Sequence, residues 1–350
     1  MKLNTESNLY IKRCLELAAL GAGNVAPNPM VGCVIVHKDR IIGEGYHEHC
    51  GEAHAEVNAI ESVKDKALLA ESTLYVSLEP CAHQGKTPPC ADLIVKHKLK
   101  QVVICNTDPF SEVDGKGIAR LKKAGIEVTT GVLESEGRWL NRRFFTFHEK
   151  KRPYIILKWA QTIDGYIDRE RSPGDDNPPL KITTDASNKL VHKLRTEEEA
   201  ILVGKNTALL DDPRLTARYW PGKNPLRLVI DPQLQLPSSL RMFNDEHETW
   251  VYNARKALCE KNICFERIND PAEFPHEIVN HLHGKDIQSV IIEGGKNTIE
   301  RFYQAGLWDE ARVFTNPMRI GNGIQAPKFI GKEMERTHIG EDLLQVYLPE

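Results

Sequence analysis

The sequence predicts a two-domain protein of the α/β class. Along both halves of the chain, short apolar runs typical of strands alternate with stretches of helical spacing, as in a sheet covered by helices on both sides. A length of 350 residues suits two domains, each large enough for a core of its own. A basic, aromatic passage at residues 141–152 separates the halves, and we place the domains at residues 1–148 and 149–350.

The first half begins with a helical stretch and an apolar strand. Helical spacing covers residues 10–20, and Pro27-Asn28-Pro29 forms a rigid turn. Residues 31–36 are a continuous apolar run, typical of a strand buried on both faces, and Ile41-Ile42 begins its hairpin partner. Beyond them we expect helices and strands in alternation, with helices at residues 55–63, 91–98 and 118–124 and strands at residues 74–78, 101–105 and 127–130.

The second half restarts the alternation after Pro153. Its strands are expected at residues 154–158, 200–203, 226–230, 249–252 and 290–292. We interpret the passage before Pro153 as a solvated linker flanked by packing aromatics. A nucleic-acid-binding patch is the alternative that its basic residues leave open.

Composition and charge are those of a globular protein of the cytoplasm. Hydrophobic residues make up 41% and charged residues 27% of the chain, and a net charge of −3 provides no basic field for nucleic acid. Residues 1–10 are polar, unlike a signal peptide, and no apolar run approaches the ~18 residues that span a bilayer. The eight cysteines form no compact disulfide framework, and Cys33 and Cys105 lie in apolar runs typical of buried thiols. We therefore expect a cytoplasmic protein that binds neither nucleic acid nor membranes.

One histidine and two cysteines form the strongest chemical signal. His54, Cys81 and Cys90 are donors suited to Zn²⁺, and three protein ligands leave one coordination position open for water. Glu56 follows two residues after the histidine. The H-x-E…P-C pattern is typical of zinc-dependent nucleobase deaminases, in which the glutamate is the acid/base and not a ligand. We therefore predict one Zn²⁺ per chain and metal-assisted hydrolysis of an exocyclic amine, with Glu56 as the catalytic residue.

The expected helices favour this assignment. His54 and Cys90 each stand at the start of a helix, where partial positive charge lowers the pKa of a thiol. The alternative is a structural zinc site closed by a fourth side chain, for which the candidates are His47, His49, Cys50 and His83. A closed site would leave Glu56 without a purpose, which favours the catalytic interpretation.

Longer motifs around these residues point to a family. Residues 26–32 (APNPMVG), 54–56 (HAE) and 80–90 (PCAHQGKTPPC) resemble the deaminase half of the bifunctional riboflavin-biosynthesis deaminase/reductases. Most zinc deaminases of nucleosides or tRNA have C-x-x-C, so the long insert between the two cysteines is more specific. The resemblance implies a cytidine-deaminase-like three-layer domain, in which Asn28 and Lys86 help to hold a pyrimidine ribosyl-phosphate substrate. Lys86 would supply a cation near the phosphate; an exposed loop lysine is the alternative.

The second half resembles the reductase half of the same family, so the likeness covers nearly the whole chain. Residues 157–165 (LKWAQTIDG) and 204–218 (GKNTALLDDPRLTAR) carry it. The resemblance implies a dihydrofolate-reductase-like fold with NADPH as the cofactor. The cofactor contacts that it implies are Ala160, Thr207 and Asp211. The substrate contacts that it implies are Arg195, Leu215 and Arg218. Two arginines suit a sugar phosphate, although a surface ion pair explains either one alone equally well.

One glycine turn also resembles the family, and one segment, residues 179–183, differs from the family's usual sequence. Glu293-Gly294-Gly295 follows an expected strand and precedes a helical pattern, where backbone N–H groups bind phosphate. A bare Gly-Gly is often only a tight turn, but its position in the family implies that Gly294 and Gly295 contact the cofactor and that Glu293 faces the substrate. The family often has Ser-x-Trp-Ile-Thr before the helix of Arg195. Here residues 179–183 are PLKIT, and we expect Lys181 to take over part of the cofactor contact.

These patterns predict a bifunctional enzyme of riboflavin synthesis. We expect it to deaminate 2,5-diamino-6-ribosylamino-4(3H)-pyrimidinone 5′-phosphate at zinc and then to reduce the ribosyl group to a ribityl chain with NADPH. Its partner is then a small molecule, and a homo-oligomer is compatible with the sequence. Two alternatives stay open: a cytidine- or tRNA-type deaminase with an unrelated C-terminal domain, and a non-catalytic zinc-stabilised binding protein.

Overall fold

The chain folds into two compact units, Met1–Lys150 and Lys151–Glu350. The structure is a computed structural model that describes residues 2–82, 88–110, 114–172, 177–244 and 247–350. Each unit has hydrophobic cores of its own. Among the described residues, every helix is too short or too polar to cross a membrane.

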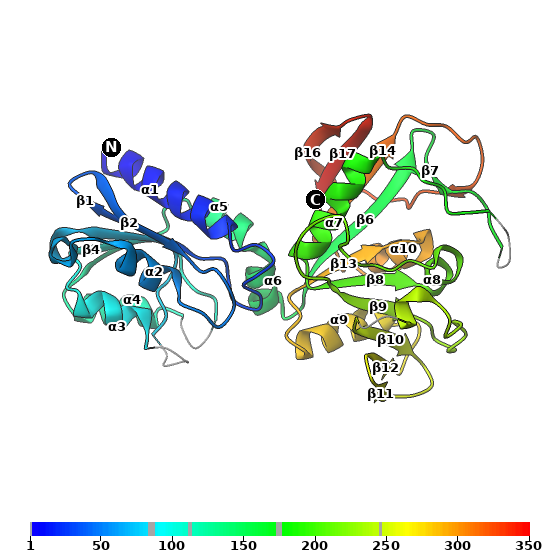
Figure 1. The fold of residues 1–350 in the computed structure, drawn as a ribbon, viewed down its shortest axis with the longest axis horizontal. Helices are drawn as coiled ribbons and strands as arrows, with labels where there is room; N and C mark the ends of the chain where they lie inside the picture. Colours follow the sequence, from blue (N-terminus) through cyan, green and yellow to red (C-terminus); the bar gives the residue numbers. More distant parts are fainter. Residues whose placement is uncertain (1, 83–87, 111–113, 173–176, 245–246) are drawn as a thin grey trace. The chain divides into compact units, whose positions relative to one another are not determined.

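The first unit is built on a mixed sheet of five strands (Figure 1). The strands are β1 (Gly32–His37), β2 (Arg40–Tyr46), β3 (Thr73–Leu78), β4 (Gln101–Asn106) and β5 (Glu127–Thr130). Their order across the sheet is β2-β1-β3-β4-β5. β1 runs antiparallel to β2 and β3, whereas β3, β4 and β5 are parallel. The five strands expected from the sequence are thus confirmed.

Helices cover both faces of this sheet. The helices are α1 (Lys2–Ala19), α2 (Ala55–Ser62), α3 (Cys90–Lys96), α4 (Lys116–Lys123), α5 (Glu134–Leu140) and α6 (Arg142–Lys150), with a 3₁₀ turn at Lys66–Glu71. One core lies between α1 and the sheet and includes the buried thiols of Cys14 and Cys105. The other core lies beneath α2, α3 and α4 and includes Cys33. The buried position expected for Cys33 and Cys105 is therefore confirmed.

Two glycines let α2 lie very close to β2. A Cβ atom at Gly45 would stand 2.3 Å from the backbone nitrogen of Ala59, and one at Gly43 would stand 2.6 Å from the Ala59 carbonyl oxygen. The Asn58 side chain donates to the Tyr46 carbonyl at 2.8 Å and ties the helix to the same strand. A larger residue at either glycine would push the helix away from the sheet, because tightly packed backbone has no room to yield.

The prediction of a solvated linker at residues 141–152 is wrong. Most of this passage is α6, and Phe144, Phe145 and Phe147 are buried. Asn141 anchors its start, since the amide side chain exchanges two 2.8 Å hydrogen bonds with the backbone of Met30. Most of the basic residues therefore lie within a packed helix rather than in an extended connection.

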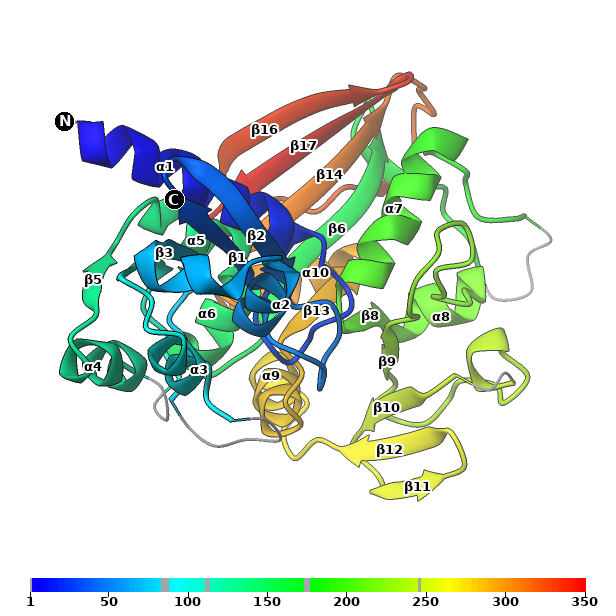
Figure 2. The same ribbon diagram turned by 60° about the vertical axis from the view of Figure 1, so that its left-hand side comes forward.

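The second unit contains a sheet of ten strands (Figures 1 and 2). Its strands are β6 (Tyr154–Thr162), β8 (Ala200–Gly204), β9 (Leu226–Ile230), β10 (Thr249–Asn253), β11 (Leu258–Glu260), β12 (Ile263–Arg267), β13 (Ser289–Glu293), β14 (Glu310–Asn316), β16 (Lys332–Ile339) and β17 (Asp342–Leu348). Their order is β11-β12-β10-β9-β8-β13-β6-β14-β17-β16. The seven strands from β12 to β14 in this order are mutually parallel, and the pairs at both ends are antiparallel. A separate two-stranded sheet joins β7 (Tyr166–Asp168) to β15 (Ile324–Gln325).

Helices cover both faces of the large sheet as well. They are α7 (Asp185–Glu197), α8 (Lys205–Asp211), α9 (Phe274–Gly284) and α10 (Lys296–Gln304), with a 3₁₀ turn at Arg241–Phe243. α9 and α10 pack on one face through Ile278 and Phe302. α7 and α8 pack on the other through Leu194 and Ala208. All five strands expected in this half are present.

The strands at both ends of the sheet, β11, β12, β16 and β17, were not expected from the sequence, although β17 (DLLQVYL) does alternate between buried and partly buried residues. β16 (KEMERTHI) is exposed along almost its whole length and lacks apolar alternation. β11 and β12 form a short hairpin that carries a disulfide between Cys259 and Cys264. Edge strands need only one pairing partner and bury few side chains, so apolar periodicity does not reveal them.

We predict that Gly45→Ala destabilises the first unit by about 1–3 kcal/mol, because the added methyl group meets the backbone of α2. Urea unfolding measures the loss, and Gly284→Ala at the end of α9 is the control, since no atom lies within 4 Å of its added Cβ. Equal stability of the two variants would contradict the close packing of α2 on β2.

Candidate active sites

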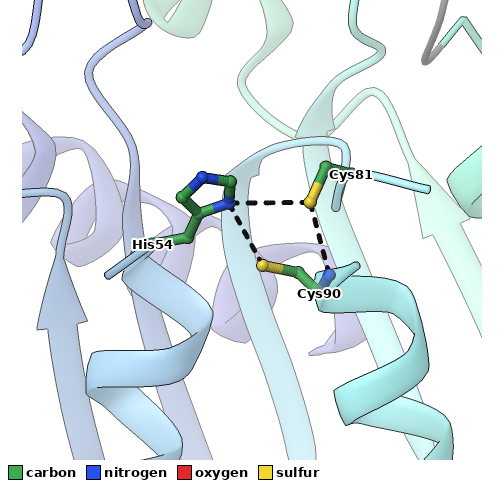
Figure 3. A group of neighbouring side chains, drawn as sticks. All are labelled: His54, Cys81 and Cys90. Carbon is green, nitrogen blue, oxygen red and sulfur yellow. Dashed lines mark hydrogen bonds between the residues drawn. The ribbon is translucent and has the colours of Figure 1, made fainter. Parts of the chain in front are cut away.

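Three side chains from separate elements converge in the first unit (Figure 3). His54 immediately precedes α2, Cys81 follows β3, and Cys90 begins α3. The Nδ1 atom of His54 lies 3.5 Å from the Sγ atom of Cys81 and 3.3 Å from that of Cys90. All three ligand atoms lie within 4.8 Å of one another. This donor set and its spacing fit a Zn²⁺ ion.

The two thiols differ in acidity. The backbone N–H of Cys90 donates to the Cys81 sulfur at 3.3 Å. Hydrogen bonds from the Cys90 thiol and from His54 lower the pKa of Cys81 to about 4, and the bond to the Cys81 sulfur raises the pKa of Cys90. Cys81 is therefore a thiolate at neutral pH, which is the form of cysteine that binds a metal.

Glu56 lies in the first turn of α2 beside this donor set. Its side chain is 3% exposed, and burial raises its pKa to about 7. A carboxyl group with a pKa near neutral both takes up and releases protons at the pH of the cell. This is the property that the acid/base role expected from the sequence requires.

His47, a candidate for a fourth zinc ligand, makes other contacts. Its Nδ1 donates to the Ala53 carbonyl at 3.0 Å, so its Nε2 accepts from the Asn28 side-chain amide at 3.1 Å. His47 therefore orients Asn28, the residue expected to hold substrate. Within the described part of the chain, neither His47, His49 nor Cys50 joins the metal-ligating group. His83 and Lys86 lie outside the described residues.

Sequence reasoning missed a buried carboxylate, Glu79, that anchors the segment before Cys81. Glu79 accepts hydrogen bonds from the backbone N–H groups of Gly115 at 3.1 Å and Ile118 at 3.0 Å. These contacts hold the end of β3 against the start of α4. A glutamate at the end of an apolar strand is the only signal that could have indicated this role.

In the second unit, Glu293, the last residue of β13, forms ion pairs with two cations. Its carboxylate accepts from Lys158 Nζ at 2.7 Å and from Arg195 at 2.8 Å. Despite burial, the charges of Arg195 and Lys158 lower the pKa of Glu293 to about 2. Arg195 and Glu293 were both expected to face substrate, and the structure brings them together. Lys158 was missed, although a lysine within an apolar strand signals a partner charge.

Three residues expected to bind the cofactor also meet. The N–H of Gly295 donates to the Thr207 hydroxyl at 2.8 Å. Gly294 has a φ of 118°, and a Cβ atom there would lie 2.9 Å from the Thr207 side chain. Gly295 stands directly before α10, where backbone N–H groups are available to an anion.

Asp211 has a partner that the sequence did not indicate. The guanidinium group of Arg171 contacts the Asp211 carboxylate, donates to Asp168 through Nε at 2.8 Å and donates to the Leu210 carbonyl at 2.8 Å. The Arg171 side chain is 4% exposed. This arginine fixes Asp211 at the end of α8.

Arg218, the other arginine expected to contact substrate, interacts with the same histidine, His192, as Arg195 and Glu293 do. Arg218 is exposed and stacks on the Tyr219 ring at 4.8 Å. Burial, followed by the charges of Arg195 and Arg218, lowers the pKa of His192 to about 4. Both arginines expected to contact substrate therefore act on one neutral histidine.

Three further residues expected at the site have surroundings of their own. Leu215 is buried and adopts a φ of 55°, next to Thr216, whose carbonyl accepts from Arg195 at 3.1 Å. Ala160 lies in β6 and packs against the cluster of α7 and β14. Lys181 is exposed and paired with Asp185 at 2.7 Å.

Comparisons with known proteins identify the two domains. Residues 4–106 match the cytidine and deoxycytidylate deaminase zinc-binding region, and residues 153–346 match the RibD C-terminal domain. The riboflavin biosynthesis protein RibD of Aquifex aeolicus is 38% identical over 96% of each chain. That of Bacillus amyloliquefaciens is 39% identical over 97% of this chain and 96% of its own.

The chain belongs to the RibD family. A crystal structure of a diaminohydroxyphosphoribosylaminopyrimidine deaminase/5-amino-6-(5-phosphoribosylamino)uracil reductase from Thermotoga maritima matches with a TM-score of 0.88, at 35% identity and over 99% of both chains.

RibD membership settles the nature of the protein. It is a bifunctional enzyme of riboflavin biosynthesis, with a zinc-binding deaminase domain and an NADPH-dependent reductase domain. The expected cytidine-deaminase-like and dihydrofolate-reductase-like folds are confirmed. Because the C-terminal match is to RibD, an unrelated C-terminal domain is excluded, and so is a non-catalytic binding protein.

We predict that Glu293→Gln lowers the free energy of unfolding by about 3–5 kcal/mol at pH 7, because Lys158 and Arg195 lose their shared carboxylate. The folded-state pKa of about 2 lies below the usual 4.5, so the carboxylate stabilises the fold above pH 4.5. The difference between the two proteins should therefore shrink as the pH falls from 4.5 towards 2. Urea unfolding at several pH values measures it.

The matched control is Glu197→Gln, which removes a partly exposed i,i+4 partner of Lys193 at 3.6 Å. It should cost no more than about 0.5 kcal/mol at any pH. A Glu293→Gln protein that behaves like this control would show that the buried cluster does not depend on its shared charge.

Proposed function

We propose that residues 1–148 are the deaminase domain and residues 149–350 the reductase domain, acting in sequence on one pyrimidine ribosyl phosphate. The substrate is 2,5-diamino-6-ribosylamino-4(3H)-pyrimidinone 5′-phosphate, and the final product is 5-amino-6-ribitylamino-uracil 5′-phosphate. The convergence of His54, Cys81 and Cys90 beside the buried Glu56 carries the proposal. The similar Thermotoga maritima protein, which is described as both a deaminase and a reductase, supports it.

Deamination is assigned to the four residues of the first unit. His54, Cys81 and Cys90 hold zinc, which supplies Lewis-acid activation of water. Glu56 would move both protons of the attacking water, one to the ring nitrogen and the other to the departing ammonia. Its pKa of about 7 suits both transfers. Asn28, held by His47, contacts the pyrimidine, and Lys86 contacts the phosphate.

Reduction is assigned to the second unit, where NADPH supplies the hydride. Thr207, Gly294 and Gly295 form a compact set for the cofactor, joined by Ala160, Lys181 and the Asp211 carboxylate. On the substrate side are Arg195, Leu215, Arg218 and Glu293. The negative charge of Glu293 is held in place by two cations, so it is a fixed acceptor for ribosyl hydroxyl groups. Arg218 is exposed and available to the phosphate.

We also propose a cytoplasmic enzyme that needs no nucleic acid or membrane partner. The net charge of −3 and the thiolate ligands of the zinc centre support these two points.

Glu56→Gln should retain zinc and lose deamination by ~10²-fold or more, because the amide keeps size and hydrogen bonding but cannot carry the proton. The measurement is incubation with the diaminopyrimidine phosphate, with and without NADPH, followed by the mass of the product. Reduction of pre-deaminated substrate is the internal control and should continue at the wild-type rate. Wild-type deamination by Glu56→Gln would disprove the acid/base role.

A fragment of residues 151–350 should bind NADPH without the first unit, because this unit has its own cores and contains every residue assigned to the cofactor. Calorimetric titration measures the affinity. Gly294→Ala in the same fragment should weaken binding roughly tenfold, about 1.4 kcal/mol, because the new methyl group meets Thr207. A folded fragment that binds no NADPH would contradict the proposed division into independent sites.

A further inference from the structure

The hairpin of β11 and β12 carries two cysteines that neither active site uses. Cys259 and Cys264 pair directly across the two strands, with Cα atoms 4.0 Å apart, and form a disulfide. Cys259 is exposed and Cys264 is half-buried. The hairpin lies at one end of the large sheet, next to β10 (Figure 2). Solvent and small reagents therefore reach both sulfur atoms.

A carboxylate stands beside the two sulfurs. Glu266 lies two residues after Cys264 in β12, so both side chains point to the same face of the sheet. One ligand atom from each of Cys259, Cys264 and Glu266 lies within 4.8 Å of the others. In the described part of the chain, this is the one such group outside the deaminase centre.

A histidine reaches the same place from the helix that covers this face. His281 of α9 directs its Nε2 atom toward Glu266, 3.6 Å from the Oε2 atom. Its other ring nitrogen lies 3.1 Å from the hydroxyl group of the buried Tyr252. The rings of Trp250 and Tyr252 pack against the imidazole at 5.2 and 5.7 Å. The imidazole is thus held beside the group through Glu266, whereas the three ligand atoms within 4.8 Å of one another are those of the two cysteines and Glu266.

We propose that, once the disulfide is reduced, Cys259, Cys264, Glu266 and His281 bind a second Zn²⁺ ion. Two thiolates, an imidazole and a carboxylate are the donors that zinc prefers, and four protein ligands close the coordination sphere, as in structural sites. The Tyr252 hydroxyl accepts from the second nitrogen of His281, which is the outer contact that metal-binding histidines usually have.

The disulfide and the zinc ion exclude each other. A dithiol reductant gives two electrons and two protons to the disulfide and is itself oxidised to a cyclic disulfide, leaving two thiols on the hairpin. Zinc binding then displaces one proton from each thiol into solvent. Both states cross-link β11 to β12, but only the zinc state also links the hairpin to α9 through His281.

The test is the zinc content of the full-length protein. The enzyme is reduced with an excess of dithiothreitol, exchanged without oxygen into buffer with Zn²⁺, desalted and measured by mass spectrometry of its metals. We expect two zinc ions per chain in the reduced protein and one in the oxidised protein. The Cys259→Ser/Cys264→Ser double variant should hold one in either condition, and NADPH binding by the same variant shows that its second unit is folded.

Two further variants test the ligand set. Cys50→Ser removes an exposed free cysteine that belongs to neither metal-ligating group, and it should keep two zinc ions when reduced. His281→Ala should bind the second zinc at least ~10-fold more weakly in competition with a chromogenic chelator, because one donor is lost. One zinc ion per chain in the reduced wild type, or equal contents in the wild type and the double variant, would overturn the proposal. Unchanged affinity in His281→Ala would overturn the four-residue site.

Discussion

The deaminase centre depends on how closely α2 approaches the sheet. Gly43 and Gly45 remove the side chains that would otherwise separate the helix from β2. The start of α2 therefore lies beside the end of β3, where Cys81 follows and Glu79 fixes the chain. His54 and Glu56 occupy that helix start, so one packing contact positions both the proposed metal ligand and the proposed proton carrier. Burial of Glu56 in the first turn of α2 raises its pKa to about 7.

The reductase unit is organised by charge rather than by close backbone packing. Glu293 ends β13, Lys158 lies on the neighbouring β6, and Arg195 reaches them from α7. A buried carboxylate is stable only when paired, so the two cations fix its position and keep it ionised. Directly after it, Gly294 and Gly295 contact Thr207. The residue proposed to contact substrate and the two residues proposed to contact the cofactor are therefore consecutive in the sequence, at positions 293–295.

Sequence patterns predicted most interior strands but missed the buried β14, and they missed the strands at both ends of the large sheet. Buried parallel strands such as β8 and β13 are continuous apolar runs, and that signal needs no knowledge of neighbours. β16 and the β11–β12 hairpin carry no such run, because an edge strand is held by one partner. The same limit explains why α6 was interpreted as a linker. Its phenylalanines pack against Leu78 and Phe110, which are distant in the sequence.

The sequence by itself determined the family, and it predicted the zinc ligands, Glu56 and most residues assigned to the two sites, because each lies within a short motif of fixed spacing. Only the tertiary structure showed that His47 orients Asn28, that Lys158 shares Glu293 with Arg195, and that Arg171 holds Asp211. It alone brought Cys259 and Cys264 together with Glu266 and His281. The physical reason is that these partners are joined by strand register and helix packing. Both arise from the burial of many side chains at once and leave no local pattern in the chain.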